Sequence, residues 1–384
     1  MDFELSQQEK MLIASVEEFA REEFPIELVR ELDKKEEFPR EIFKKMAEVG
    51  WFSLPIQPEY GGVGGKMIDS ILVIEKLAKF FSAAALGYTI SIMLSRLIGV
   101  HGSHEQKDLL LPGMCKGDIW IAFSQTEPSG GNDFLSMSTY ANRDGDKYIL
   151  NGQKTWISYA DISDYILTVA RTDSNASKKS LGITLFLVPK QSPGIEIKLI
   201  PKLGYRAFHS YEIFYDNVQV PLSSVLGEVD KGFYNLLVAI NVERLGAGAL
   251  ALGVGQAAFE ATLEYAKLRN AFGRPIGQFQ QIQRYISDMA ISLEQARLLL
   301  YKAAWLESQD NPAVLECNMA KVACTEASAQ VTSDAMRIFA SDGYSNESDI
   351  QRYFRDSRLG LFSPGSNEVV RSLICQQLEL PKSY

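Results

Sequence analysis

Cysteine and histidine, which often serve as metal ligands or nucleophiles, are sparse in this sequence. Its four cysteines form no CxxC pair, and Cys317 and Cys324 are seven residues apart, on one face of an expected helix, which favours core packing. Two of the three histidines, His101 and His104, flank a glycine where a turn is expected, so we predict no metal site. Gly246-Ala-Gly248 lies in a helical pattern and not after a strand, which disfavours a Rossmann nucleotide site.

Five other parts of the chain combine polar, aromatic and glycine residues. They are Thr126-Glu-Pro-Ser-Gly-Gly-Asn-Asp133; Asn151-Gly-Gln-Lys-Thr-Trp-Ile-Ser158; Lys202-Leu-Gly-Tyr-Arg206 with Asp216 to Pro221; Val242-Glu-Arg-Leu245 with Arg269-Asn-Ala-Phe-Gly273; and Arg337 to Tyr344 with Arg352 to Arg358 and Ser363-Pro-Gly-Ser-Asn-Glu368. In this order they resemble the motifs of the acyl-CoA dehydrogenase family, over essentially the whole chain. The resemblance implies an FAD enzyme that removes or adds hydrogen across the carbon-carbon bond beside an acyl thioester.

The resemblance also implies which residues hold FAD. Thr126, Trp156 and Ser158 are expected at the flavin ring, with Trp156 packed on it and Ser158 hydrogen-bonded near its N5. Arg269 and Phe272 match a family element that meets the pyrophosphate and adenine of FAD held by a neighbouring subunit, which implies a homotetramer. A planar guanidinium suits a diphosphate. The other implied cofactor residues are Gln280, Arg337, Gly343, Ser366 and Glu368.

The C-terminal motif departs from the family at the catalytic position. Where many members carry the glutamate that removes the α-proton, this chain has Pro364, which cannot accept a proton. A thioester α-proton is weakly acidic, so a nearby carboxylate is needed. Glu243 is the predicted base, because it matches the position used by isovaleryl and long-chain members; Glu368 is the weaker substitute. The alternative is that Glu243 only pairs with an arginine on a helix face.

The same resemblance implies a substrate arm and a mechanism. Asn132, Asn241 and Arg244 are the predicted substrate-binding residues, with Arg244 along the arm of the acyl carrier. Glu243 would take the α-proton while the β-hydride passes to flavin N5, and an electron-transfer flavoprotein would reoxidise the flavin. A further departure puts Arg337 and Ala340-Ser341 where the family has a glutamine and two glycines near the pyrophosphate, and side chains there crowd a close backbone approach.

Other functions on the same fold stay open at this point. The Pro364 segment also resembles members that reduce enoyl thioesters or that act on acyl groups bound to carrier proteins. A flavin oxidase or monooxygenase would consume oxygen and need no electron-transfer partner. A catalytically silent subunit would have kept the fold and lost the base.

The elements that must position these residues form three groups. Helical spacing dominates residues 1–119, beginning with a capping-box pattern at Ser6 to Glu9. Short apolar runs with turn signals, such as Asp144-Gly145-Asp146, indicate a β-domain over 120–230. Helices return over 231–384, at about 234–270, 280–307 and 314–339. We therefore predict an α+β fold, with an N-terminal helical domain, a central antiparallel β-domain and a C-terminal helical bundle.

The composition and net charge limit the kinds of partner that the protein is expected to bind. At 384 residues, with 46% hydrophobic and 23% charged residues, the chain has the composition of a globular protein. Its net charge of −9 disfavours nucleic acid and anionic membrane surfaces. The N-terminal residues have neither a basic nor an apolar signal region, and no stretch resembles a membrane span, so a cytoplasmic location is expected.

Overall fold

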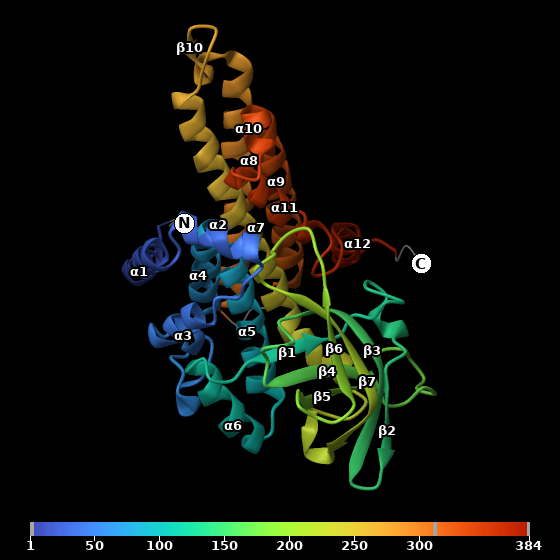
Figure 1. Ribbon diagram of the computed structural model, residues 1–384. Helices are drawn as coiled ribbons and strands as arrows, with labels where there is room; N and C mark the ends of the chain where they lie inside the picture. Colours follow the sequence, from blue (N-terminus) through green and yellow to red (C-terminus); the bar gives the residue numbers. More distant parts are fainter. Residues whose placement is uncertain (1–3, 310–312, 382–384) are drawn as a thin grey trace.

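The computed structural model describes residues 4–309 and 313–381 and runs from helices through strands to helices (Figure 1). The first helices are α1 (Gln7–Glu23), α2 (Ile26–Lys35), α3 (Arg40–Glu48), α4 (Met67–Phe80), α5 (Ser82–His101) and α6 (His104–Cys115). The strands are β1 (Ile121–Ser124), β2 (Tyr140–Asp144), β3 (Lys147–Ser158), β4 (Tyr165–Arg171), β5 (Ile183–Pro189), β6 (Ile195–Ile200), β7 (Ser210–Pro221) and β8 (Val225–Leu226). The last part contains α7 (Gly232–Leu268), β9 (Asn270–Ala271), β10 (Arg274–Pro275), α8 (Gln280–Glu307), α9 (Val314–Phe339), α10 (Ser341–Tyr344), α11 (Asp349–Ser357) and α12 (Asn367–Gln377). The predicted α+β class is confirmed.

Local signals in the sequence set several of these boundaries. The Ser6 hydroxyl accepts from the Glu9 amide, and the Glu9 carboxylate accepts from the Ser6 amide, so the expected capping box forms at the start of α1. The bounds of α8 and α9 agree with the predicted ranges 280–307 and 314–339. Cys317 and Cys324 are both buried on α9, as the core-packing interpretation requires.

The central sheet has the order β6-β7-β3-β2-β4-β5-β8, with β1 added parallel to β4. Its long hairpin β2–β3 turns at Gly145, as the Asp-Gly-Asp signal predicts. β3 pairs with β7 from Lys147↔Pro221 to Ser158↔Ser210, but the register shifts between Lys154 and Ile157. This irregularity matters for function because Trp156 lies within it.

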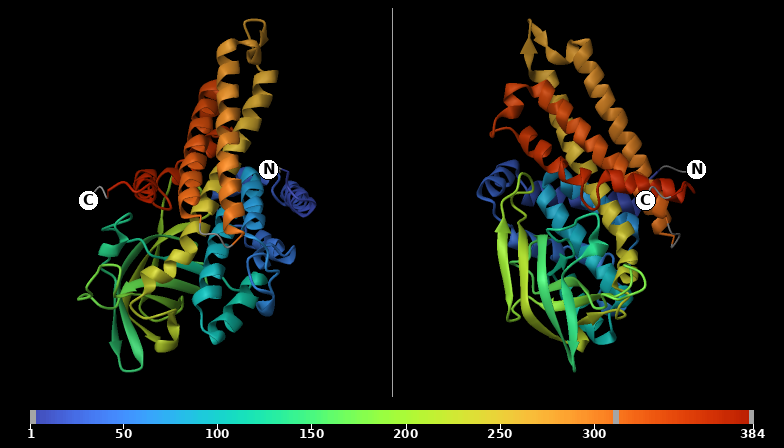
Figure 2. Two further views of the ribbon diagram at one scale, coloured as in Figure 1. Left: turned by 180° about the vertical axis from the view of Figure 1, so that it is seen from behind. Right: turned by 90° about the vertical axis from the view of Figure 1, so that its right-hand side faces the viewer.

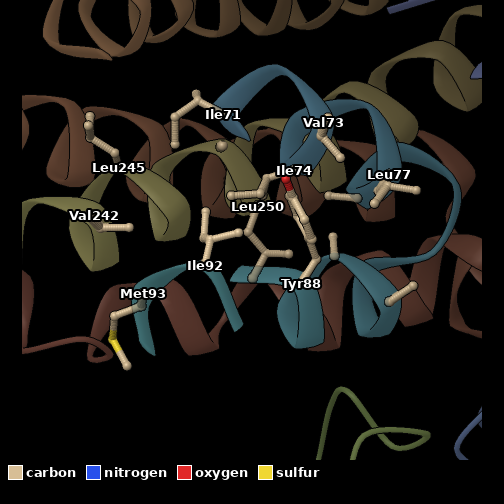
Figure 3. Packing of buried hydrophobic residues seen from close by; sticks show 14 of the residues in the cluster. Ile71, Val73, Ile74, Leu77, Tyr88, Ile92, Met93, Val242, Leu245 and Leu250 are labelled. Carbon is tan, nitrogen blue, oxygen red and sulfur yellow. The ribbon is translucent and has the colours of Figure 1, made fainter. Parts of the chain in front are cut away.

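The main hydrophobic core joins the two helical parts. Figure 3 shows Ile71, Ile74 and Leu77 of α4 packed with Tyr88 and Ile92 of α5 and with Val242, Leu245 and Leu250 of α7. The Tyr88 hydroxyl donates to the carbonyl of Trp51 at 3.0 Å, so the one polar atom of this buried ring is satisfied. The core therefore fixes α7, the helix that carries Glu243, against α4 and α5.

Close approach of α7 to its neighbours depends on glycine. A Cβ built on Gly253 would lie 2.3 Å from the carbonyl oxygen of Glu75 on α4, so no larger residue fits without a shift. Two helices, α5 and α7, are long and apolar enough to cross a membrane by length and composition, but 67% and 61% of their apolar windows are buried inside the protein. Their hydrophobicity is accounted for by core packing.

Two adjacent residues of α11 connect the three parts of the chain. Arg355 donates to Asp33 of α2 at 2.5 Å and to the carbonyl of Leu203 at 2.9 Å. Asp356 accepts from the Ser82 hydroxyl of α5 and from the Tyr205 amide, both at 2.6 Å. All of these contacts join residues more than 150 positions apart in sequence.

Candidate active site

Glu243 lies on α7 beside two buried hydrophobic residues. Val242 and Leu245 point into the core against α4 and α5, as Figure 3 shows. Because each helical residue is rotated by about 100°, Glu243 and Arg244 leave the helix on its other sides. Within residues 4–309 and 313–381, neither the Glu243 carboxylate nor the Arg244 guanidinium has a hydrogen bond or ion pair. The carboxylate is therefore not committed to a structural salt bridge there.

Burial dominates the electrostatics of Glu243. Removal from water raises the pKa of its carboxyl to about 7, against the opposing attraction of Arg244 and of Lys321 on α9. A carboxyl with this pKa exchanges its proton near neutral pH, which is the property required of a general acid or base. The helix-face ion pair considered as the alternative for Glu243 is not present among the described residues.

Lys321 links the Pro364 segment to Glu243. The Lys321 ammonium, which interacts electrostatically with Glu243, donates to the carbonyl of Gly365 at 2.9 Å. The base position that Pro364 occupies and the predicted replacement, Glu243, are thus linked by one buried side chain. Glu368 is exposed in the first turn of α12, and hydrogen bonds from its own amide and from Ser366 lower its pKa. This exposure makes Glu368 the poorer candidate for the base.

Asn132 and Ser366 connect the β-domain loop to the C-terminal segment. The Ser366 amide donates to Oδ1 of Asn132 at 3.1 Å, and the Asn132 amide group donates to the Ser366 hydroxyl at 3.4 Å. Ser366 also caps α12 by accepting from the Val369 amide. The structure thus brings a predicted substrate residue and a predicted cofactor residue together.

Asn241 and Arg244 face the start of α9. Asn241 donates to the Glu307 carboxylate at 2.8 Å, and the same oxygen accepts from the Ala313 amide at 2.9 Å. Arg244 interacts electrostatically with Glu243 and Cys317, and its pKa is lowered by burial. Arg244 is therefore a cation with free donors, whereas Asn241 is already used in joining α7 to α8.

The predicted flavin residues of the β-domain lie close together at the ends of β1 and β3. The Thr155 amide donates to the carbonyl of Thr126 at 2.9 Å, which places Thr126 beside Trp156. Trp156 has a φ of +62° in the irregular part of β3, and its ring remains 56% exposed. A large exposed ring held in an unfavourable backbone conformation is typical of a binding surface. Ser158 follows two residues later, partly buried.

A buried ion pair lies behind the surface formed by Thr126 and Trp156. Lys154 donates to a Glu127 oxygen and to the carbonyl of Gln125, both at 2.9 Å. Glu127 also accepts from the Ser138 amide and hydroxyl and from the Thr139 amide. Despite burial, these donors hold the pKa of Glu127 at about 2, and burial lowers that of Lys154 to about 8. Both residues lie within motifs that resemble the family, but the motifs alone predicted no role for either.

Five other cofactor candidates lie elsewhere, at the far end of α7, α8 and α9. We call them the far group: Arg269, Phe272, Gln280, Arg337 and Gly343. Both views of Figure 2 place the β9–β10 hairpin at the opposite end of these helices from the β-sheet. Phe272 at the hairpin tip is 96% exposed, and Arg269 contacts Asp342 at 3.9 Å. Gln280 and Arg337 are exposed, whereas Gly343 is buried. A hollow of about 500 Å³ lies beside them, lined by Ala266, Lys267, Pro275 and Gln283 among others.

At the departure, Ala340 keeps a backbone conformation that suits the glycine it replaces. Ala340 adopts φ 51° and ψ −127°, a conformation that favours glycine. Asp342, for which no role was predicted, accepts from the Tyr265 hydroxyl at 2.7 Å, and Tyr265 stacks on Phe339. Arg337 pairs with Asp334 at 3.2 Å. The far group therefore presents two exposed arginines with an aromatic ring.

Family models match three consecutive parts of the chain. They are the acyl-CoA dehydrogenase N-terminal domain at 6–118, middle domain at 122–218 and C-terminal domain at 230–379. The chain belongs to the acyl-CoA dehydrogenase family. Its similarity to a probable acyl-CoA dehydrogenase, YngJ of Bacillus subtilis, is 35% identity over 98% of this chain and 100% of that protein.

Other relatives differ in activity. A 3-(aryl)acrylate reductase of Clostridium sporogenes is 36% identical over 97% of this chain and 99% of its own length. The CarC subunit of a caffeyl-CoA reductase-Etf complex, from Acetobacterium woodii, is 35% identical over 97% and 98%. Membership of the family thus shows an acyl-CoA dehydrogenase-type flavoenzyme without fixing the direction of its reaction.

Solved structures agree with the family. Butyryl-CoA dehydrogenase of Megasphaera elsdenii superposes with a TM-score of 0.95 at 30% identity, over 99% of this chain and all of that one. The prolyl acyl carrier protein oxidase AnaB gives 0.93 at 30%, over 98% and 100%. A complex of PigA with FAD gives 0.94 at 29%, over 99% and 100%.

The predicted cofactor, FAD, is confirmed, and the residues present fit it. The exposed Trp156 ring offers a flat apolar face to an isoalloxazine, and Arg269 and Arg337 offer cationic groups to a pyrophosphate. These two groups lie at opposite ends of α7 and α8 in one chain (Figure 2). The separation fits the expectation that the far group serves the FAD of another subunit.

Proposed function

We propose that this protein dehydrogenates an acyl thioester between its α and β carbons, with Glu243 as the base. The observation that carries the proposal is the partly buried carboxylate of Glu243, which has no hydrogen bond or ion pair among the described residues and a pKa of about 7, beside the segment where Pro364 replaces the usual glutamate. FAD supplies the acceptor for the β-hydride. The chain supplies the α-proton acceptor and the groups that orient the thioester.

Each of these groups has a defined task in the proposed reaction. Glu243 removes the α-proton in its ionised form, while the electron pair of that C–H bond forms the new carbon-carbon double bond. Arg244, whose guanidinium has no hydrogen-bond acceptor within residues 4–309 and 313–381, orients the carrier arm. The Asn132–Ser366 contact closes the loop of the β-domain against the C-terminal segment, so both segments meet the acyl group together.

Reduction of an enoyl thioester is the second candidate. Two relatives are named as reductases, and a carboxyl with a pKa near 7 is protonated often enough to return a proton to the α carbon. One of these relatives is named for a 3-(aryl)acrylate and the other for caffeyl-CoA, which makes cinnamoyl-type thioesters a necessary part of any substrate panel.

The decisive experiment follows the flavin spectrum without oxygen. Purified holoenzyme is titrated with saturated acyl-CoAs of increasing length, branched acyl-CoAs and 3-arylpropionyl-CoA. Bleaching of the oxidised flavin band supports dehydrogenation and identifies the acyl group. If none bleaches it, but dithionite-reduced enzyme is reoxidised by an enoyl-CoA, the reductase candidate replaces the proposal.

Two further conditions separate the other candidates. Acyl groups loaded on a carrier protein test the carrier-bound alternative, for which AnaB is the structural precedent. Oxygen uptake comparable to turnover with an artificial acceptor would indicate an oxidase, and its absence favours an electron-transfer flavoprotein as partner. CarC, as a subunit of an Etf complex, supports that partner by similarity. The cytoplasmic location stays a prediction.

A stripe on α8 supports the proposed homotetramer. Ile291, Leu298 and Trp305 repeat every seven residues and are 55%, 49% and 57% exposed, so one face of α8 is apolar and uncovered in the single chain. We expect Leu298→Asp to shift the protein to smaller species and to weaken FAD retention, because the far cofactor group then lacks its neighbour. Light scattering during size-exclusion chromatography, with the flavin absorbance, measures both effects.

The matched control is Leu109→Asp on α6, where a leucine of similar exposure lies outside the stripe. It should leave mass and flavin content unchanged. An unchanged mass for Leu298→Asp would contradict an α8 interface.

A further inference from the structure

Lys321 is a fully buried lysine for which the proposed reaction has so far assigned no task. It lies on α9 with none of its surface exposed. Its ammonium donates to the Gly365 carbonyl at 2.9 Å and to Oδ1 of Asn367 at 2.6 Å. Asn367 is held in turn by Thr325 and Glu326. Two of the three ammonium donors are thus used, and within the described part of the chain the third has no acceptor.

The charges around Lys321 come from three elements. Its ammonium interacts electrostatically with Glu243 and Arg244 of α7, with Glu368 of α12 and with Glu326 of α9 itself. Burial and Arg244 lower the pKa of Lys321 to about 8, and the three carboxylates oppose this shift. At neutral pH the side chain is still mostly a cation. The attraction of Lys321 and of Arg244 opposes the effect of burial on the Glu243 pKa.

A neutral side chain could hold the turn equally well. A glutamine at this position would donate to Gly365 without the cost of burying a charge, whereas an ammonium brings a positive charge into a site that must hold an ionised carboxylate. The charge is hydrogen-bonded to the Pro364–Gly365 turn and interacts electrostatically with Glu243, which calls for a function beyond hydrogen bonding.

We propose that Lys321 is a positioning residue for the α-proton transfer, one that holds the Pro364–Gly365 turn against α9 and keeps the neighbouring Glu243 carboxylate ionised. This inference rests on the proposed function. The lysine touches neither carbon that reacts; it acts through Glu243 and through the turn.

The test compares Lys321→Gln, which keeps donors but loses the charge, with Lys321→Arg, which keeps the charge. The measured quantity is the apparent second-order rate constant of anaerobic flavin reduction by the best thioester of the panel. It is followed from pH 6 to 9.5. We expect Lys321→Gln to lose about fivefold at pH 7 and to recover at high pH, because loss of the cation raises the Glu243 pKa, which is about 7 in the wild type, by about one unit. Lys321→Arg should keep the wild-type midpoint.

The control is Lys302→Gln, an exposed lysine of α8 paired with Glu316. It should match the wild type at every pH. A Lys321→Gln variant with the wild-type midpoint, or with an equal loss at every pH, would overturn the inference, since a purely structural lysine predicts those results.

A second readout does not depend on activity. The infrared carbonyl band of the protonated Glu243 carboxyl, assigned by its loss in Glu243→Gln, is followed against pH in wild type and in Lys321→Gln. A higher midpoint in Lys321→Gln supports the inference, and an equal midpoint overturns it. If no thioester changes the wild-type flavin spectrum, the proposed function has failed, whereas the infrared result still decides the effect of Lys321 on Glu243.

Discussion

Glu243→Gln is expected to slow reduction of the bound flavin by a good acyl thioester about 10²- to 10⁴-fold, the usual contribution of a general base. Glutamine has nearly the same shape and cannot accept the α-proton. Because FAD is held by other residues, flavin content and thioester binding should remain close to wild type. Stopped-flow absorbance gives the rate, and a thioester titration of the oxidised variant gives the binding.

The pH dependence of the wild type provides an independent check. Since the Glu243 pKa is about 7, flavin reduction should rise with pH and level off above about 8. Glu368→Gln is the matched control, because Glu368 is the other carboxylate of the segment and is fully exposed. If Glu368→Gln abolished reduction and Glu243→Gln did not, the base would have to be reassigned.

Glu243 should also affect stability, with a definite sign. Its folded-state pKa lies above its ordinary value, so folding favours the protonated form, and stability is lost as the pH rises through about 7. Glu243→Gln should therefore melt at a higher temperature than wild type at pH 8, by the equivalent of roughly 1–3 kcal/mol. The difference should shrink as the pH falls and disappear well below the ordinary glutamate pKa of 4.5, where the carboxyl is neutral in both states.

The second large effect is expected at the ion pair beneath Trp156. Glu127→Gln leaves the ammonium of Lys154, which has no exposed surface, without its counter-charge, and should lower the free energy of unfolding by about 3–5 kcal/mol. The Trp156 surface depends on this pair, so flavin should be lost as well. Denaturant unfolding monitored by circular dichroism, together with flavin content after dialysis, measures both.

Controls separate this pair from ordinary surface ion pairs. Glu31→Gln breaks the exposed pair with Lys35 on α2 and should leave the free energy of unfolding nearly unchanged, because solvent screens this pair. Combining Glu127→Gln with Lys154→Met removes both charges and should recover part of the loss. A cost for Glu127→Gln as small as that for Glu31→Gln would show that the pair is not structural.

Much of the architecture could be read from the sequence because its signals are local. The capping box at Ser6, the hairpin turn at Gly145 and the limits of α8 and α9 depend on residues a few positions apart. The motifs indicated the family and its cofactor for a similar reason, because each motif is a short stretch of adjacent residues with a recognisable sequence. The role assigned to Glu243 remains a prediction.

Long-range contacts were not predicted. Asn132 and Ser366 are 234 residues apart, and no local pattern shows that they bond to each other. The burial of Lys321 could have been predicted from helical spacing. Lys321 lies four residues after Cys317 and three before Cys324, on the helix face already assigned to the core. A lysine on a buried face is a strong signal, but its partners, Gly365 and Asn367, come from another segment.

The contacts of Arg355 and Asp356 have a consequence for how the protein comes apart. These two side chains bond to α2, to α5 and to the turn at residues 203–205, so none of the three parts of the chain can separate without breaking them. Once broken, the contacts leave buried charges unmatched, which makes partially opened states costly. The helical parts and the sheet should therefore unfold in a single cooperative transition. A destabilising substitution in α11 should lower the stability of the N-terminal helices as much as that of the C-terminal helices.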